Sequence, residues 1–294
     1  MRALLALILA VAPANAALHF VIIGGLGGEK EYEERFSMAV EKLSESARSI
    51  STEPEAVHVL QGADAKLDNI VETFIGLQNS LTEDDSLAVY LIGHGTHDGD
   101  HYKLNIPGPD ITAARLANLL EKIKATRQLV VNTTSSSGAS VETLLTEGRI
   151  VIAATKNGRE KNVTMFGKYW ADAFEDPEAD VDKNQSITVK EAYDYTDAKV
   201  KLFFETGSRL ATEHSRIEGE LSSSFTLARL GEAAAASDPT LAPLVARREA
   251  IEMKVDQLKL RKDAMSEAEY FGELQELLLT LADVHSEIAA EQAK

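Results

Sequence analysis

The feature that most constrains the fold is a regular alternation between short apolar runs and longer amphipathic stretches. Five runs rich in β-branched residues recur at residues 18–23, 56–60, 86–92, 128–131 and 149–154. The stretches between and after them have apolar residues at helical spacing and predict helices near 29–49, 65–80, 112–124, 138–146, 164–175 and 189–206. Strands that alternate with helices predict an α/β fold, in which helices sandwich a mostly parallel sheet.

The first residues have the pattern of an export signal. One arginine is followed by an apolar run of about ten residues and by a small-x-small cleavage site that ends at Ala16. A membrane span would need roughly 20 apolar residues, and Pro13 and Asn15 interrupt this run. We therefore expect residues 1–16 to be a signal peptide, the protein to have no membrane span, and its location to be periplasmic or secreted.

The composition excludes several classes of function. The chain of 294 residues has 47 acidic and 30 basic residues and a formal net charge of -17, so it would repel a nucleic-acid backbone. It has no cysteine, which excludes disulfides and thiol chemistry. The glycine-rich turn at residues 24–28 begins like a dinucleotide fingerprint, but Lys30 replaces its third glycine and acidic residues follow. We expect no nucleic-acid partner and no organic cofactor.

The C-terminal part of the chain has a different pattern. An alanine-rich stretch at 231–240 predicts a linker. After it, apolar residues repeat every seven positions in two series: Leu244, Ile251, Leu258, Met265 and Leu274, Leu281, Ile288. Two helices joined near Ser266 would form an antiparallel hairpin over 241–294. We expect this hairpin to pack against the main domain or to self-associate with a second copy, the alternative being a separate partner.

Two of the predicted strands end in residues suited to catalysis. The strand at 86–92 leads to His94 between two glycines, a tight turn that leaves the N–H of Gly95 free to bind an oxyanion. The strand at 128–131 leads to small hydroxyl residues that include Ser135, and then to a predicted helix. Because the carboxyl ends of neighbouring parallel strands share one edge of the sheet, we expect His94 beside Ser135.

These motifs resemble those of the caspase/legumain group of cysteine peptidases. In that group one strand carries a histidine in S-G-H-G, and the next carries the nucleophile in D/E-A-C-x-S-G. Here Ser137 and Gly138 match the final S-G, and Ser135 falls on the cysteine. The resemblance covers about residues 17–230 and extends to bacterial secreted proteins with an L-A-T-E-H segment, here 210–214. It implies a caspase-like fold, a general acid/base role for His94 and a protein or peptide partner.

The resemblance also implies a specificity pocket near the loop at 155–159. Lys156 and Arg159 in this loop would recognise an acidic side chain of the substrate or partner. The alternative is that the two basic residues form part of an ordinary solvated surface.

Serine at position 135 departs from the family's chemistry. A thiol has a pKa of about 8.5 that falls beside a histidine, whereas a serine hydroxyl needs a base, usually oriented by an acid such as the nearby Asp98. The first interpretation is an inactive pseudopeptidase that works as a binding or assembly module. The second is an active serine hydrolase that uses Ser135 and His94. Two further alternatives are that Ser135 caps a helix and that His94, His97 and His101 bind a metal.

Residues 180–191 follow the spacing of an EF-hand calcium loop. The residues at ligand positions are Asp180, Asp182, Asn184, Ser186 through its carbonyl group, Thr188 and Glu191. Gln185 replaces the glycine that the sharp turn favours, at a cost on the order of 1 kcal/mol. We expect a structural calcium ion, with an acidic turn that caps the next helix as the alternative. A third interpretation of the whole chain is a calcium-stapled scaffold that works through its C-terminal hairpin.

Overall fold

The computed structural model describes residues 17–51, 54–229 and 240–292. The predicted signal peptide (1–16) and residues 231–239 of the predicted linker lie outside them. No helix of the described part is long and apolar enough to cross a membrane.

A six-stranded sheet in the order β10-β8-β7-β3-β1-β2 forms the centre of the molecule. Five of its strands are parallel, and β10 at the edge runs antiparallel to β8. The strands are β1 (Leu18–Gly24), β2 (Val57–Gln61), β3 (Ser86–Ile92), β7 (Arg127–Asn132), β8 (Arg149–Ala153) and β10 (Arg216–Glu218). The central strands β3, β7 and β8 are almost entirely buried, which explains why they read as continuous apolar runs.

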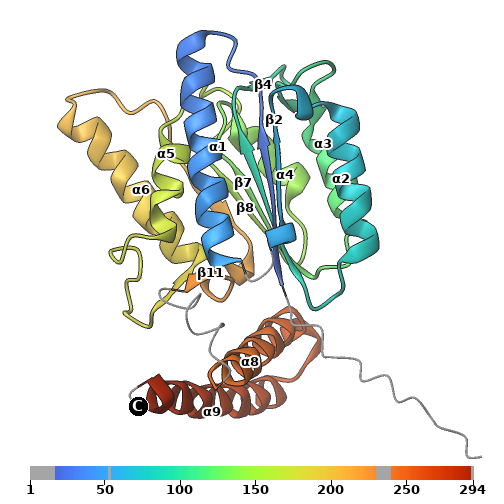
Figure 1. The fold of residues 1–294 in the computed structure, drawn as a ribbon, viewed down its shortest axis with the longest axis vertical. Helices are drawn as coiled ribbons and strands as arrows, with labels where there is room; N and C mark the ends of the chain where they lie inside the picture. Colours follow the sequence, from blue (N-terminus) through green and yellow to red (C-terminus); the bar gives the residue numbers. More distant parts are fainter. Residues whose placement is uncertain (1–16, 52–53, 230–239, 293–294) are drawn as a thin grey trace, which may run out of the picture.

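Helices cover both faces of this sheet, as Figure 1 shows. One face packs against α1 (Lys30–Ile50), α5 (Phe166–Trp170) and α6 (Val189–Thr206). The other packs against α2 (Leu67–Ser80), α3 (Ala113–Leu120) and α4 (Val141–Leu144). Alternate residues of a strand belong to the two cores, as with Phe20 in the first and Val21 in the second. The predicted α/β fold class is confirmed.

Two small sheets, which the sequence analysis did not predict, border the main sheet. Strands β4 (Gly95–His97), β5 (Tyr102–Leu104) and β6 (Ile111–Thr112) follow β3 and rise from its carboxyl end. Strand β9 (Ser186–Thr188) pairs antiparallel with β11 (Thr226–Arg229). Strands of two to four residues are too short to give a periodic pattern, so only the structure identifies them.

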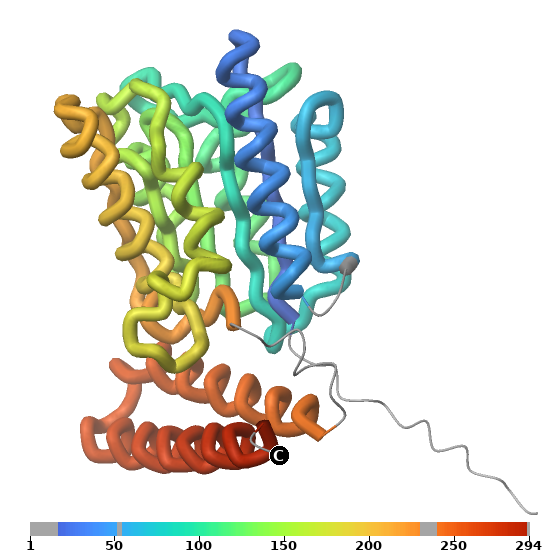
Figure 2. The backbone as a smooth tube through the Cα atoms, turned by 60° about the vertical axis from the view of Figure 1, so that its left-hand side comes forward, coloured from blue at the N-terminus to red at the C-terminus, as the bar shows by residue number. Residues whose placement is uncertain are grey.

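The C-terminal helices α8 (Ala242–Leu260) and α9 (Glu267–Gln292) form the predicted antiparallel hairpin. Ile251, Val284 and Ile288 form its core. The hairpin lies at the amino ends of the parallel strands, away from the catalytic candidates, and α8 lies between the main domain and α9 (Figures 1 and 2). The Arg127 Nε atom at the start of β7 lies 3.0 Å from the Asp256 carboxylate of α8. The hairpin is therefore anchored to the main domain by a largely buried ion pair.

Candidate functional site

His94 leaves the sheet directly after β3 and is held between two aromatic rings of α1. The rings of Tyr32 and Phe36 meet the imidazole edge-to-face, with centroid distances of 5.1 and 5.0 Å. The Nε2 atom lies 3.0 Å from the carbonyl oxygen of Gly27, to which its N–H donates. In the neutral imidazole this leaves Nδ1 as the nitrogen that can accept a proton.

Ser135 follows β7 and is bonded to the turn that carries His94. Its hydroxyl donates to the carbonyl oxygen of Gly95 at 3.0 Å and accepts the N–H of Gly95 at 3.2 Å. Only 4% of the residue is exposed. The N–H of Gly95, which we expected to be free for an oxyanion, therefore binds Ser135 instead. The helix-cap alternative for Ser135 is wrong, because the short helix η3 (Ser137–Ser140) begins two residues later and its N-cap is Ser136.

A buried hydrogen-bond network holds the turn around Ser135. The Asn132 side-chain oxygen accepts hydrogen bonds from the hydroxyls of Tyr102 and Thr134, at 3.1 and 2.8 Å. Its amide group donates to the Ser140 hydroxyl at 3.0 Å. Burial raises the pKa of Tyr102 to about 12, so its hydroxyl stays protonated. The small hydroxyl residues after β7 thus bind the Asn132 side chain and one another, and they hold the turn in place.

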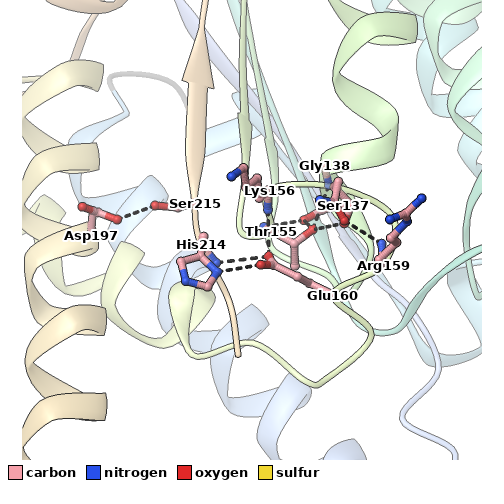
Figure 3. A network of polar contacts seen from close by, with 10 residues as sticks. Ser137, Gly138, Thr155, Lys156, Arg159, Glu160, Asp197, His214 and Ser215 are labelled. Atoms are coloured by element: carbon pink, nitrogen blue, oxygen red, sulfur yellow. Dashed lines mark hydrogen bonds and ion pairs between the residues drawn. The ribbon is translucent and has the colours of Figure 1, made fainter. Parts of the chain in front are cut away.

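Glu160 links the turn after Ser135 to two other loops. Its carboxylate accepts the backbone N–H of Lys156 at 2.8 Å, and its Oε1 lies 2.6 Å from Nδ1 of His214 (Figure 3). Its carbonyl oxygen accepts the N–H of Ser136 at 2.8 Å. Ser136 has a φ of 57°, and its buried hydroxyl has no hydrogen-bond partner in the described structure. The L-A-T-E-H segment noted in the sequence thus supports the candidate site through His214.

Glu213, the other acid of that segment, is a buried carboxyl group. Both of its oxygens lie within hydrogen-bond distance of the Met165 N–H, at 2.7 and 2.8 Å, directly before α5. Burial raises the pKa of Glu213 from 4.5 to about 7, although the Met165 N–H and Arg35 favour its charged form. Sequence reasoning missed this group, although the segment's match to known proteins pointed to it.

Lys156 and Arg159 lie on the loop after β8 and are both exposed. Figure 3 shows them near Ser137 and Thr155, whose hydroxyls lie 3.1 Å apart. Neither basic side chain forms an ion pair among the described residues, so both are available to an acidic ligand.

The other candidate groups near His94 serve the local turn. The Asp98 carboxylate accepts the backbone N–H of His101 at 2.8 Å and pairs with Lys103 at 2.9 Å. The hydrogen bond from Lys103 lowers the pKa of Asp98. Asp98 therefore stabilises the β4–β5 turn, and no hydrogen bond joins it to His94 among the described residues. Within the same residues, His94, His97 and His101 do not gather their nitrogen atoms into a potential metal site.

The loop at 180–191 brings three carboxylates together. Oxygen atoms of Asp180, Asp182 and Glu191 lie within 4.8 Å of one another. Asp180 is buried and accepts the N–H groups of Asn184 and Gln185 at 3.1 and 3.0 Å. Gln185 has a φ of 67°, the left-handed conformation expected for this position of the loop.

The end of this loop also starts α6. The Thr188 hydroxyl accepts the N–H of Glu191 at 3.2 Å, and the Glu191 carboxylate accepts the N–H of Thr188 at 2.9 Å. This reciprocal pair is a capping box, so the N-cap of α6 is Thr188. The Ser186 hydroxyl instead accepts a hydrogen bond from Arg229 at 3.1 Å.

Comparison with known proteins identifies the family. The model of the Peptidase C13 family matches residues 44–218, which include His94 and Ser135. Among solved structures, the chain is similar to protein GSU0716 from Geobacter sulfurreducens, with a TM-score of 0.48, 11% identity and coverage of 74% of this chain and 98% of that chain. It is also similar to the Drosophila initiator caspase Dronc, with a TM-score of 0.42, 10% identity and coverage of 69% and 78%. No curated protein matches the sequence.

The family match confirms the legumain part of the predicted resemblance. Because the chain contains no cysteine, the nucleophile of a cysteine peptidase is absent. The match spans more than half of the 294 residues, and the chain therefore belongs to the Peptidase C13 family.

Proposed function

We propose that this chain is an exported protein that binds a protein or peptide without cleaving it. The observation that carries the proposal is the state of the Ser135 hydroxyl, which is buried and bonded to the backbone of Gly95. A serine nucleophile transfers its proton to a base during attack. Here a carbonyl oxygen holds that proton, and a carbonyl oxygen is too weak a base to accept it.

Two further contacts support a non-hydrolytic role. The N–H of Gly95 is engaged by Ser135, so it is not available to stabilise an oxyanion. The Nε2–H group of His94 is engaged by Gly27, and no hydrogen bond joins His94 to Ser135 among the described residues. A base acts on a nucleophile only within hydrogen-bond reach, directly or through one water.

The partner that binds at the loop after β8 is proposed to be an acidic peptide segment. Lys156 and Arg159 are exposed without ion-pair partners in the described structure, on a loop that is anchored through Glu160. This loop therefore presents two positive charges in a chain with a net charge of -17. A carboxylate of the partner would gain charge-assisted hydrogen bonds there.

A fluorophosphonate probe tests the absence of hydrolysis. We expect no labelling of the wild-type protein, the Ser135→Ala variant or the His94→Ala variant. A trypsin control would show that the probe is active. Labelling of the wild type that is lost in both variants would overturn the proposal in favour of a serine hydrolase.

A single introduced thiol tests the burial of position 135. Because the chain has no cysteine, the Ser135→Cys variant would carry its only thiol. We expect alkylation at least about tenfold slower than in Thr96→Cys, because Thr96 is exposed and lies on β4 near the same turn. Equal alkylation rates would mean that position 135 is open to a substrate.

A structural calcium ion is a second proposal, based on the convergence of Asp180, Asp182 and Glu191. The loop joins the segment after α5 to α6, and its strand β9 pairs with β11. An ion there would hold these elements together as a staple. Isothermal titration with calcium should show one site of roughly 10⁻⁴–10⁻³ M affinity, as in extracellular modules. No heat above dilution, or equal binding by Asp180→Asn, would contradict it.

Self-association through the hairpin is a third proposal. Phe271, Leu278 and Leu279 are exposed on α9, although they are large and apolar. Two copies could bury these side chains against each other about a two-fold axis. The acidic side chains of Glu276 and Asp283 lie near this stripe, so like charges would meet, and association should strengthen with ionic strength.

Sedimentation measurements test this third proposal. We expect the wild type to dimerise at high salt and the Leu278→Asp variant to be monomeric. Leu210→Asp is the matched control, because Leu210 is 88% exposed on the main domain. A monomeric wild type at all salt concentrations would contradict self-association.

A further inference from the structure

A cavity of about 260 Å³ lies between α1 and α5, on the sheet face that these helices cover. Phe36 and Ala39 of α1, Ala171 after α5 and Ile92 of β3 give it apolar surfaces. Thr133, two residues before Ser135, also lines it, and the Thr133 hydroxyl is already bonded to the Leu91 carbonyl oxygen at 2.9 Å. The cavity thus offers apolar walls at a volume near the lower end of the range for ligand pockets, which begins at about 300 Å³.

The charged residues that line this cavity are mainly basic. They are Arg35, Lys42 and Lys168, against a single acid, Asp172. Lys42 pairs with Asp172, which leaves two more cations than acids among the lining residues. The Arg35 guanidinium also donates to the Thr164 carbonyl oxygen and interacts with the buried Glu213, which does not line the cavity. The Lys168 ammonium group lies 5.2 Å from the centre of the Tyr169 ring and has no carboxylate partner in the described residues. This excess is notable in a chain with 47 acidic and 30 basic residues.

Apolar walls and a local positive charge together favour one class of ligand. A purely apolar molecule would not use the cations, and a highly charged polar molecule would not fill the apolar walls. We propose that this cavity binds a small amphipathic anion, with its apolar part against Phe36 and Ile92 and its acidic group near Arg35 and Lys168. The proposal is independent of whether the chain hydrolyses or binds peptides.

The cavity also lies beside the candidate site. Phe36 lines the cavity and contacts the ring of His94 edge-to-face at 5.0 Å. A ligand that packs against Phe36 would therefore change the surroundings of His94. Because the two side chains already touch, this coupling needs no large movement of the backbone.

The single tryptophan of the chain gives a direct probe of occupancy. Trp170 lies at the end of α5, next to Ala171, and is buried against the rings of Phe166 and Phe174. Decanoate, kept below its micelle concentration, should change the Trp170 fluorescence of the intact protein in a saturable way with one site. Decanol has the same chain without the charge and should bind at least about tenfold more weakly, because it cannot use the cations.

Two variants and a control separate cavity binding from surface adsorption. Ala39→Leu fills the cavity and Lys168→Glu reverses a lining charge, so each should weaken decanoate binding about tenfold or more. Lys124→Glu is the matched control, because Lys124 is exposed and does not line the cavity. Circular dichroism would confirm that each variant is folded. No saturable binding, or equal affinity in all variants, would overturn the proposal.

Two more measurements complete the test. Vesicles of phosphatidylglycerol should not bind the protein in place of decanoate. If the protein bound these vesicles but not decanoate, the cations would be assigned to a membrane surface and the cavity proposal would be overturned. The imidazole NMR signals of His94 should shift as decanoate saturates the protein. Unshifted signals in the saturated complex would overturn the coupling between the cavity and His94.

Discussion

Two loops of this protein contain the residue patterns most typical of a functional site, and their polar groups are arranged in opposite ways. The loop around Ser135 is buried, and most of its polar groups bind one another or the neighbouring turn. The loop at 180–191 is exposed over residues 181–185, and three of its carboxylates converge on one point. Both loops contain non-glycine residues with a left-handed backbone: Ser136 at a φ of 57° in the first, and Lys183 and Gln185 at 60° and 67° in the second.

The difference separates a loop whose polar groups mostly have hydrogen-bond partners within the fold from a loop whose carboxylates lie close to one another. In the first loop, the hydrogen bonds between Ser135 and Gly95 join the turn after β7 to the turn after β3. In the second loop, carboxylates that repel one another remain close, which is unfavourable unless a cation or hydrogen bonds offset the repulsion. Substitutions in the first loop should therefore change the stability of the fold, and calcium should act through the second loop.

The largest effect is expected from Asn132→Ala in the first loop. The Asn132 side chain is fully buried and bonds to Tyr102, Thr134 and Ser140. Its removal deletes four buried hydrogen bonds, at about 0.5–1.5 kcal/mol each, so we expect a loss of about 4 kcal/mol in the free energy of unfolding. Urea denaturation measures this value. Asn118→Ala, at an exposed position of α3, is the control, and an equal loss there would contradict the importance of the buried network.

The next largest effect on the free energy of unfolding is expected from Glu213, and this effect depends on pH. Its pKa is about 7 in the folded protein and 4.5 as the ordinary value, so the folded state keeps the proton while the unfolded state loses it. The free energy of unfolding should therefore fall as the pH rises from about 4.5 to 7, by about 3 kcal/mol at 1.4 kcal/mol per pKa unit.

Glu213→Gln tests this dependence, since glutamine stays neutral. The variant should match the wild type near pH 4 and exceed its stability by about 3 kcal/mol at pH 8. Urea denaturation across this pH range is the measurement, with Glu72→Gln on the exposed surface of α2 as control. A variant that is less stable than the wild type at pH 8 would show that the charged carboxylate is needed to hold the start of α5.

The comparison also shows what the sequence alone can predict. The five parallel strands of the main sheet and the helices were predicted within a few residues, because buried parallel strands and amphipathic helices leave strong periodic patterns. The edge strand β10 has only three residues and was not predicted. The spacing from Asp180 to Glu191 located the converging carboxylates, because consecutive loop residues set their own geometry. The order of the strands predicted that the turns of His94 and Ser135 meet, but not that the Ser135 hydroxyl binds the backbone of Gly95. The pairing of Glu160 with His214, 54 residues away, had no signal in the sequence. Such contacts depend on how distant turns meet in the folded chain.

Calcium should change the free energy of unfolding less than the substitutions of Asn132 and Glu213 do. With 2 mM calcium and an affinity of about 10⁻⁴–10⁻³ M, binding to the folded state alone should raise the free energy of unfolding by about 0.6–1.8 kcal/mol. Thermal unfolding with and without calcium measures it. Asp180→Asn should abolish the increase, whereas Glu45→Gln, an exposed acid on α1, should leave it unchanged. An equal increase in Asp180→Asn would assign the ion to another place.

The smallest effect concerns the left-handed residues Ser136 and Gln185, one from each loop, and compares the loops directly. Glycine adopts a positive φ without the cost that other residues incur, so Gln185→Gly should raise the free energy of unfolding by about 1 kcal/mol. Ser136→Gly should relieve the same cost and also remove a buried hydroxyl that has no partner in the described structure, so its gain should be larger. Urea denaturation of both variants measures the difference. The calcium increment should persist in Gln185→Gly and in Ser136→Gly, because neither change removes a carboxylate. A destabilised Ser136→Gly would mean that the Ser136 side chain supports the turn. The hydrogen bonds of the first loop would then not account for all of the interactions that hold it.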